Sequence, residues 1–164
     1  MSTTIDLATS PPDLTDDSDA DDQDSAMIAL LPITSDWCKI DLPHMTLVYA
    51  GLIKDLSLTD FNELAKDAAS LAMISNTVYT KVSGVEVFGD TEKVNVLKLQ
   101  MTPELFAMRK FVEKWNVSKF PFSPHCTIGP VGPPLDYPPN ALAFNRIMVG
   151  WGNDQMTFRM GGTY

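Results

Sequence analysis

The chain repeats one short pattern of side chains that could do chemistry together. Residues 43–47 read PHMTL and residues 124–128 read PHCTI, and these two segments hold both histidines of the sequence. In each segment a proline precedes the histidine, and a threonine and a branched aliphatic residue follow it at the second and third positions. Self-similarity inside a chain indicates related structural units. We therefore expect two related halves that each deliver one histidine to a shared site.

Strand geometry makes each histidine and its threonine neighbours in space. Successive side chains of a β-strand point to opposite faces, so residues i and i+2 share a face. His44 and Thr46 then point together, and so do His125 and Thr127. The opposite face of both strands is apolar and carries Met45, Leu47, Cys126 and Ile128. If the two strands lie near each other, two imidazoles and two hydroxyls converge.

Such a set of groups suits the cleavage of a phosphodiester without a metal ion. Imidazole titrates near neutral pH, so one ring can be neutral while the other is protonated. The neutral ring accepts a proton from a water or a sugar hydroxyl, and the charged ring gives one to the leaving oxygen. Threonine hydroxyls donate hydrogen bonds to the non-bridging oxygens of a phosphate between the rings.

A structural histidine and a zinc site are the alternatives. A single strand histidine is more often a surface or hydrogen-bonded residue, and only the repetition favours catalysis. His125 and Cys126 are adjacent in a strand and point to opposite faces, so they do not easily bind one zinc ion. Cys126 is then a small buried hydrophobic residue, and Cys38 a packing residue. Because the sequence also lacks a nucleotide-binding glycine loop, we predict neither a metal nor a cofactor.

Charge is distributed unevenly along the 164 residues. Residues 1–25 hold eight aspartates and no basic side chain, whereas residues 26–164 carry 13 acidic and 12 basic side chains. A segment this polar cannot repay its ordering entropy, so we predict a disordered tail over 1–25 and one folded domain over 26–164. The nearly neutral domain lacks the basic excess that long nucleic acids require, which leaves a small anionic substrate.

Cysteine content and hydropathy predict a cytoplasmic protein. Two cysteines are too few for a disulfide framework, which indicates a reducing compartment. The N-terminal residues show no signal-peptide pattern, and no apolar run reaches the ~20 residues of a membrane span. No membrane partner is expected, and the oligomeric state stays open.

Periodicity and capping residues predict seven strands and two helices. Ser57 begins a capping pattern with Asp60, and Thr102 followed by Pro103 begins a second helix. The predicted strands are 27–33, 44–50, 77–88, 93–101, 122–129, 143–151 and 155–160, and the first helix is 58–74. This order predicts an α+β fold with mainly antiparallel sheets, two outer helices and an approximate two-fold axis between the halves.

The paired motifs resemble those of the 2H phosphoesterase superfamily, which includes the 2′-5′ RNA ligases and the RNA 2′,3′-cyclic phosphodiesterases. The resemblance covers residues 27–160. The stretches PHMTLVYAG and FSPHCTIG are similar to bacteriophage members, some of which hydrolyse cyclic oligonucleotide signals of antiphage defence. The resemblance implies a bilobal, pseudo-symmetric fold. It also implies that His44 and His125 are the acid–base pair and that Thr46 and Thr127 hold the phosphate.

One position departs from the pattern of the resembled family. The RNA-ligase branch often has a basic residue three positions after its second threonine, where this chain has Pro130. This argues against ligation of long RNA. Which histidine is the acid and which the base depends on substrate orientation.

Three further residues are candidates for substrate binding. Trp37, in the loop before the first motif, offers a ring that could stack on a base, or that packs on the core as a lid residue. Phe88 at a predicted hairpin is a second stacking candidate, with hairpin packing as its alternative. Lys39 could approach a phosphate, or it is a solvated loop residue.

The sequence therefore predicts a metal-independent phosphodiesterase that hydrolyses a small cyclic nucleotide or cyclic oligonucleotide, with phage counter-defence as a role. One alternative is an RNA 2′,3′-cyclic phosphodiesterase or 2′-5′ RNA ligase-like enzyme. Another is a non-catalytic nucleotide-binding or virion-associated module.

Overall fold

A single antiparallel sheet organises the computed structural model, which describes residues 24–38, 40, 42–89, 91–130 and 138–161. Within these residues seven strands join in the order β2-β1-β6-β3-β4-β5, and β7 pairs with β6. All of these pairs are antiparallel. The strands are β1 Ser25–Pro32, β2 Met45–Leu52, β3 Val78–Phe88, β4 Val94–Leu99, β5 His125–Pro130, β6 Ala141–Trp151 and β7 Asp154–Arg159. The predicted α+β class with mainly antiparallel strands is confirmed.

Two helices cover one side of the sheet, where the capping residues predicted them. Helix α2 spans Leu58–Ile74, and Ser57 and Asp60 form its capping box. Helix α3 spans Pro103–Val112, and the Thr102 side chain accepts a hydrogen bond from the Leu105 backbone N–H. Short 3-10 turns lie at Ile53–Asp55 and Glu113–Trp115. None of the described helices is long and apolar enough to span a membrane.

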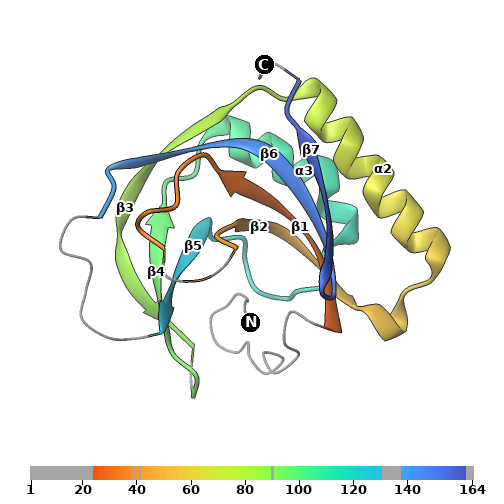
Figure 1. The fold of residues 1–164 in the computed structure, drawn as a ribbon, viewed down its shortest axis with the longest axis horizontal. Helices are drawn as coiled ribbons and strands as arrows, with labels where there is room; N and C mark the ends of the chain where they lie inside the picture. The colour runs from red at the N-terminus through yellow and green to blue at the C-terminus, as the bar shows by residue number, and fades with distance from the viewer. Residues whose placement is uncertain (1–23, 39, 41, 90, 131–137, 162–164) are drawn as a thin grey trace.

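The long strand β3 links the two halves of the sheet. Its first residues pair with β6 and its later residues pair with β4. The sheet curves so strongly that β2 and β5, at opposite ends of the strand order, contact each other (Figure 1). This curvature makes one face of the sheet convex, under the helices, and the other face concave. Each of the two meeting strands carries one histidine motif.

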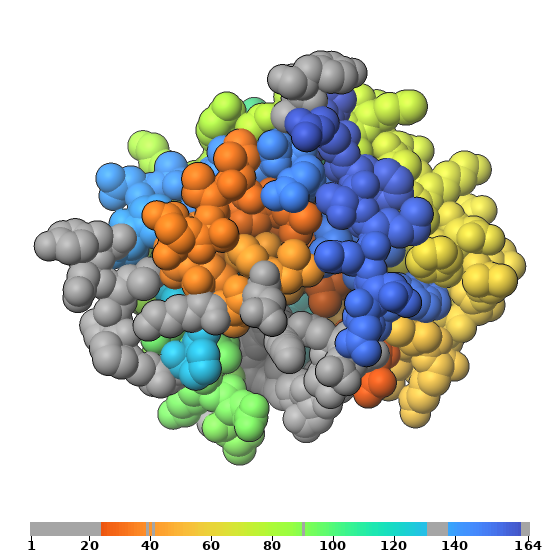
Figure 2. All heavy atoms as spheres, viewed as in Figure 1, coloured from red at the N-terminus to blue at the C-terminus, as the bar shows by residue number. Residues whose placement is uncertain are grey.

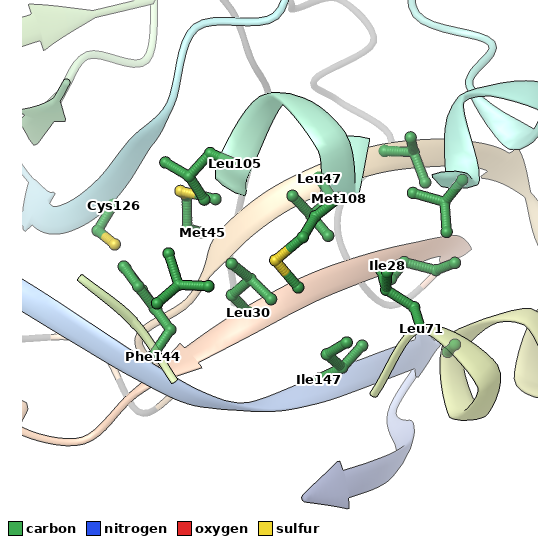
Figure 3. Packing of buried hydrophobic residues seen from close by; sticks show 14 of the residues in the cluster. Ile28, Leu30, Met45, Leu47, Leu71, Leu105, Met108, Cys126, Phe144 and Ile147 are labelled. Carbon is green, nitrogen blue, oxygen red and sulfur yellow. The ribbon is translucent and has the colours of Figure 1, made fainter. Parts of the chain in front are cut away.

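The main core lies between the convex face and the helices. Figure 3 shows Met45, Leu47 and Cys126 packed with side chains of β1, β6 and α3. Met45 and Cys126 are fully buried, and Leu47 and Ile128 are 1% and 4% exposed. Burying these apolar side chains contributes about 1.5–3 kcal/mol each to stability. The predicted apolar face of both motif strands is confirmed.

Several strand boundaries differ from the prediction. Strand β1 begins at Ser25, before the expected Met27. Strand β2 continues through Gly51, which was expected to end it, because Gly51 has a φ of 109° at an irregular step in the pairing. Strand β5 begins only at His125, since Pro124 has no N–H to donate to a neighbouring strand.

Candidate active site

Both histidines are anchored in the same way. His44 directly precedes β2, and its Nδ1 lies 2.8 Å from the carbonyl oxygen of Leu42. His125 begins β5, and its Nδ1 lies 2.7 Å from the carbonyl oxygen of Ser123. Because a carbonyl oxygen only accepts hydrogen bonds, each Nδ1 carries the proton and donates it. Each Nε2 is therefore the nitrogen that exchanges protons, and each ring is fixed two residues back along its own chain.

The two rings share one environment. The edge strands that carry them are in contact, and a positive charge on His44 lowers the pKa of His125. The contact between β2 and β5 and the direction of this effect agree in bringing the two rings into one region. Burial is the largest cause of the lowering of the pKa for both groups, because it disfavours the charged ring. Burial and the charges of Lys98 and His44 together lower the pKa of His125 from 6.5 to about 4.

The two threonines lie on the concave face of the sheet. Thr46 and Thr127 are partly buried, whereas the residue before each of them is fully buried in the core. Thr46 pairs with Ala29 of β1, and its hydroxyl lies 3.8 Å from the sulfur of Met27. A thioether is a weak acceptor, so this hydroxyl is available to a better partner. Each threonine therefore lies on the same face of the sheet as the histidine of its motif.

Lys98 is a candidate site residue that the sequence analysis did not identify. It pairs with His125 across β4 and β5, and its ammonium donates a hydrogen bond to the Ser123 hydroxyl. The ammonium also lies 5.3 Å from the centre of the Phe88 ring. Lys98 therefore places a cation beside His125. The one sequence signal was a lysine inside the apolar strand VNVLKL.

Phe88 belongs to the same group of side chains. Its ring centre lies 4.7 Å from that of His125, at an interplanar angle of 58°. This contact supports one side of the imidazole, so the predicted hairpin position of Phe88 is also a position beside His125. Figure 2 shows β5 and the β3–β4 hairpin side by side on this face of the molecule.

A β-bulge adds Tyr49 to the concave face, although the two-residue period predicts that Tyr49 faces away from His44. Thr46 pairs with Ala29 and Val48 with Ile28, so Leu47 is an extra residue between them. Leu47 and Val48 are consequently both in the core. Tyr49 then pairs with Met27, which lies on the same side of β1 as Ala29. No local sequence signal indicates this reversal, since a bulge interrupts the two-residue period.

The loop before β2 does not present Trp37 to a base. Trp37 is 5% exposed, and its indole N–H donates to the carbonyl oxygen of Thr34 at 3.0 Å. The ring belongs to the main core, so its predicted stacking role is not supported and the packing alternative describes it. Lys39 lies outside the described residues.

Cys38 connects the two motifs. Its sulfur lies 3.5 Å from the carbonyl oxygen of Thr127 and 3.6 Å from that of Ile40. Burial raises the pKa of this thiol, so it stays protonated and acts as a donor. The loop that ends at His44 is thereby attached to the strand that carries Thr127. This is a more specific role than the packing expected from the sequence.

The donor set contains no evident metal-binding group. Among the described residues, no cluster of three or more His, Cys, Asp and Glu side chains could hold a metal ion.

Solved structures with the same fold include bacterial and yeast proteins. No protein-family profile and no curated protein matches the sequence. TT0787 of Thermus thermophilus aligns with a TM-score of 0.61 and 11% identity, covering 85% of this chain and 100% of its own. E. coli LigT complexed with 3′-AMP aligns with a TM-score of 0.54 and 12% identity, covering 83% and 94%. Usb1 of Kluyveromyces marxianus aligns with a TM-score of 0.53 and 11% identity, covering 84% and 98%.

A fourth solved structure is described as a phosphoesterase, with a TM-score of 0.53 and 13% identity, covering 83% of this chain and 95% of its own. These likenesses establish the fold. The chain has the α+β architecture of the 2H phosphoesterase-like structures, with two helices on a mostly antiparallel sheet.

Proposed function

We propose that this protein is a metal-independent phosphodiesterase of the 2H phosphoesterase type, acting on a small nucleotide with a cyclic or oligonucleotide linkage. One observation carries the proposal. Two imidazoles from different halves of the chain, each anchored through Nδ1 to a carbonyl oxygen, lie at the starts of β2 and β5, which contact each other. A pure binding module has no need for two titratable rings held in matching orientations.

We infer the roles of the two rings from the asymmetry around them. His125 has Lys98 directly opposite, so its neutral form is favoured, and it acts as the general base. Its Nε2 takes a proton from the attacking water as the new P–O bond forms. The protonated Nε2 of His44 gives a proton to the leaving oxygen as the ester P–O bond breaks. Each proton transfer of this kind contributes about 10²–10⁴ in rate.

The remaining groups position the phosphate and offset its charge. The hydroxyls of Thr46 and Thr127 donate hydrogen bonds to non-bridging oxygens, which carry most of the developing charge. The Lys98 ammonium lies on the same face as His125 and stabilises that charge electrostatically. The rings and hydroxyls therefore supply proton transfer and orientation from side chains alone.

Solved structures of LigT support a small nucleotide as the ligand. That protein has been crystallised with 3′-AMP and with NADP⁺. The same likeness favours a second candidate function, an RNA 2′,3′-cyclic phosphodiesterase or 2′-5′ RNA ligase-like activity. Pro130 and the nearly neutral domain argue against ligation of long RNA.

The resemblance of PHMTLVYAG and FSPHCTIG to bacteriophage sequences extends the proposal to a biological role. We propose hydrolysis of cyclic oligonucleotide signals of antiphage defence, in the cytoplasm of an infected host. Cys38 and Cys126 are both free thiols, a state that a reducing compartment preserves.

The deciding experiment measures turnover of cyclic dinucleotides, cyclic trinucleotides and 2′,3′-cyclic mononucleotides with EDTA present. We expect turnover by the natural protein and a loss of about 10²–10⁴ in kcat in His44→Ala and in His125→Ala. Ser70→Ala, on an exposed part of α2, is the matched control and should keep full activity. Tight binding of a panel member without turnover would instead identify the binding module.

A further inference from the structure

Two arginines face each other on the strands beyond β1. Arg146 of β6 and Arg159 of β7 are directly paired across the two strands. Like charges placed directly opposite each other in a sheet destabilise it. No carboxylate forms an ion pair with either arginine among the residues that the structure describes. An anion bound between the two guanidinium groups would offset this repulsion.

The pairing pattern places both arginines on the concave face. Arg146 pairs with Leu31, which belongs to a small apolar cluster with Met27, Ala29 and Met148. Ala29 of this cluster pairs with Thr46, so the cluster and the proposed catalytic groups share a face. A bulge at Asn145 lets Phe144 enter the core while Arg146 faces the concave side. Arg159 lies on that side because it is the direct partner of Arg146.

The Arg146 guanidinium is held in place before any ligand arrives. Its Nη2 donates to the carbonyl oxygen of Pro32 at 3.2 Å, and its Nε donates to the side-chain oxygen of Asn145 at 3.3 Å. Several of its N–H groups stay available for a phosphate, since a guanidinium has five. Arg159 is exposed and can adjust to the ligand. A fixed donor beside an adjustable one favours a bidentate phosphate contact.

The arginine pair lies at a definite distance from the proposed catalytic groups. Leu30 pairs with Met45, so the neighbouring residues His44 and Leu31 lie side by side in the next row. Arg146 is one strand further than Leu31. With about 4.8 Å between neighbouring strands, the Cα atom of Arg146 is about 10 Å from that of His44, and the Cα atom of Arg159 is about 14 Å from it. On the other side of the rings, Lys98 lies one strand from His125.

We propose that Arg146 and Arg159 form a second phosphate-binding subsite, which makes the substrate a nucleotide with at least two separated phosphates. This inference rests on the proposed function and narrows its substrate class. The phosphate that is cleaved lies between the histidines, and Leu31 of the apolar cluster lies between the two subsites. A cyclic dinucleotide or trinucleotide occupies both subsites, whereas a 2′,3′-cyclic mononucleotide occupies one.

The test compares Arg146→Gln, Arg159→Gln and the double variant on two substrates, a cyclic dinucleotide and a 2′,3′-cyclic mononucleotide. Loss of a charged hydrogen bond should lower kcat/KM for the dinucleotide about tenfold to a hundredfold, mainly through KM. The mononucleotide should change less than about twofold, because it does not reach this subsite. Lys66→Gln on α2 removes the same charge from an exposed position and is the control.

Three results would overturn the subsite: unchanged dinucleotide kinetics in Arg159→Gln, equal losses on both substrates, or turnover of the mononucleotide alone by the natural protein. Arg159→Gln protects the test against misfolding of Arg146→Gln, because the Arg159 side chain is exposed. If no substrate is turned over, calorimetric binding of the cyclic dinucleotide separates the two ideas. If the affinity falls at least tenfold in the double variant, the subsite is supported and only the catalytic proposal is wrong. If the affinity is unchanged, both proposals are wrong.

Discussion

The two histidines have the same local anchor and different neighbours. Each Nδ1 donates to the carbonyl oxygen two residues earlier in the chain, so the rings present Nε2 in matching ways. Only His125 has Lys98 as its strand partner and Phe88 against its ring. A pair that is equivalent in sequence is therefore unequal in electrostatics, and the proposed assignment of His125 as the base rests on this inequality.

The first prediction at this scale concerns the pH dependence of Lys98→Gln. A general base works when neutral, so kcat/KM should rise with pH through the His125 pKa of about 4. At higher pH kcat/KM should decrease again as His44, which must be protonated, loses its proton. This alkaline limb should lie below the ordinary imidazole pKa of 6.5, because burial lowers the pKa of His44. Removing the Lys98 charge raises the pKa of His125 and moves the acidic limb to higher pH. Profiles from pH 3 to 9 measure the shift.

Charge controls keep this result interpretable. Lys66→Gln should leave both limbs of the profile in place, since Lys66 is on α2 under the convex face. Besides Lys98, the charged group that acts on His125 is His44. An acidic limb that does not move in Lys98→Gln would contradict the assignment of His125 as the base.

At the scale of single elements, local irregularities decide which side chains enter the site. The extra residue Leu47 in β2 turns Tyr49 to the concave face, and the bulge at Asn145 in β6 does the same for Arg146. The loop before β2 is attached to β5 through the Cys38 thiol. Helices α2 and α3 act at a distance from this chemistry, because they cover the convex face (Figure 1).

This separation predicts that a helix-cap mutation changes stability without changing catalysis. Ser57→Ala removes the side-chain acceptor of the Asp60 N–H and should lower the free energy of unfolding by about 1 kcal/mol. Urea denaturation measures the loss, while kcat and KM should stay at their natural values. Thr59 lies two residues further in the same turn, and its side chain makes no such cap. Thr59→Ala should therefore leave the free energy of unfolding nearly unchanged. A fall in kcat that matches the stability loss would show that α2 shapes the site.

At the scale of the whole molecule, curvature brings the two edge strands together. Strands β2 and β5 are separated by four strands in the sheet, yet they are in contact. Closing the sheet in this way places two partly buried imidazoles in one region, which favours their neutral forms. The pH dependence of stability should therefore come in part from the same groups that we propose for catalysis.

Global stability should accordingly fall on acidification. Between the unfolded pKa of 6.5 and the folded pKa of about 4, the unfolded chain binds more protons at His125, so stability decreases as pH falls. Because the ring is partly exposed, the expected loss from this group between pH 7 and pH 4 is about 2 kcal/mol. Urea denaturation at both pH values should show that loss shrinking in His125→Asn. An equal loss in the variant and the natural protein would contradict it.

Much of the fold could be predicted from residue patterns because those patterns are local. Capping residues marked both helices, with α2 matching at both ends, and the two-residue period separated Met45 and Cys126 from the histidines and threonines. Prolines and glycines shifted strand ends by a few residues, as at Pro124 and Gly51. The α+β class followed from the order of these elements.

The amino-acid sequence by itself determined the order of the elements, the apolar faces and the two matched His-x-Thr pairs, since each depends on neighbours a few residues apart. Only the tertiary structure decided that β2 and β5 meet, that Lys98 lies beside His125, and that Trp37 is in the core. It also decided that Tyr49 and Arg146 face the concave side. These facts depend on strand register and sheet curvature, which arise from pairing between distant segments and leave no local period in the sequence.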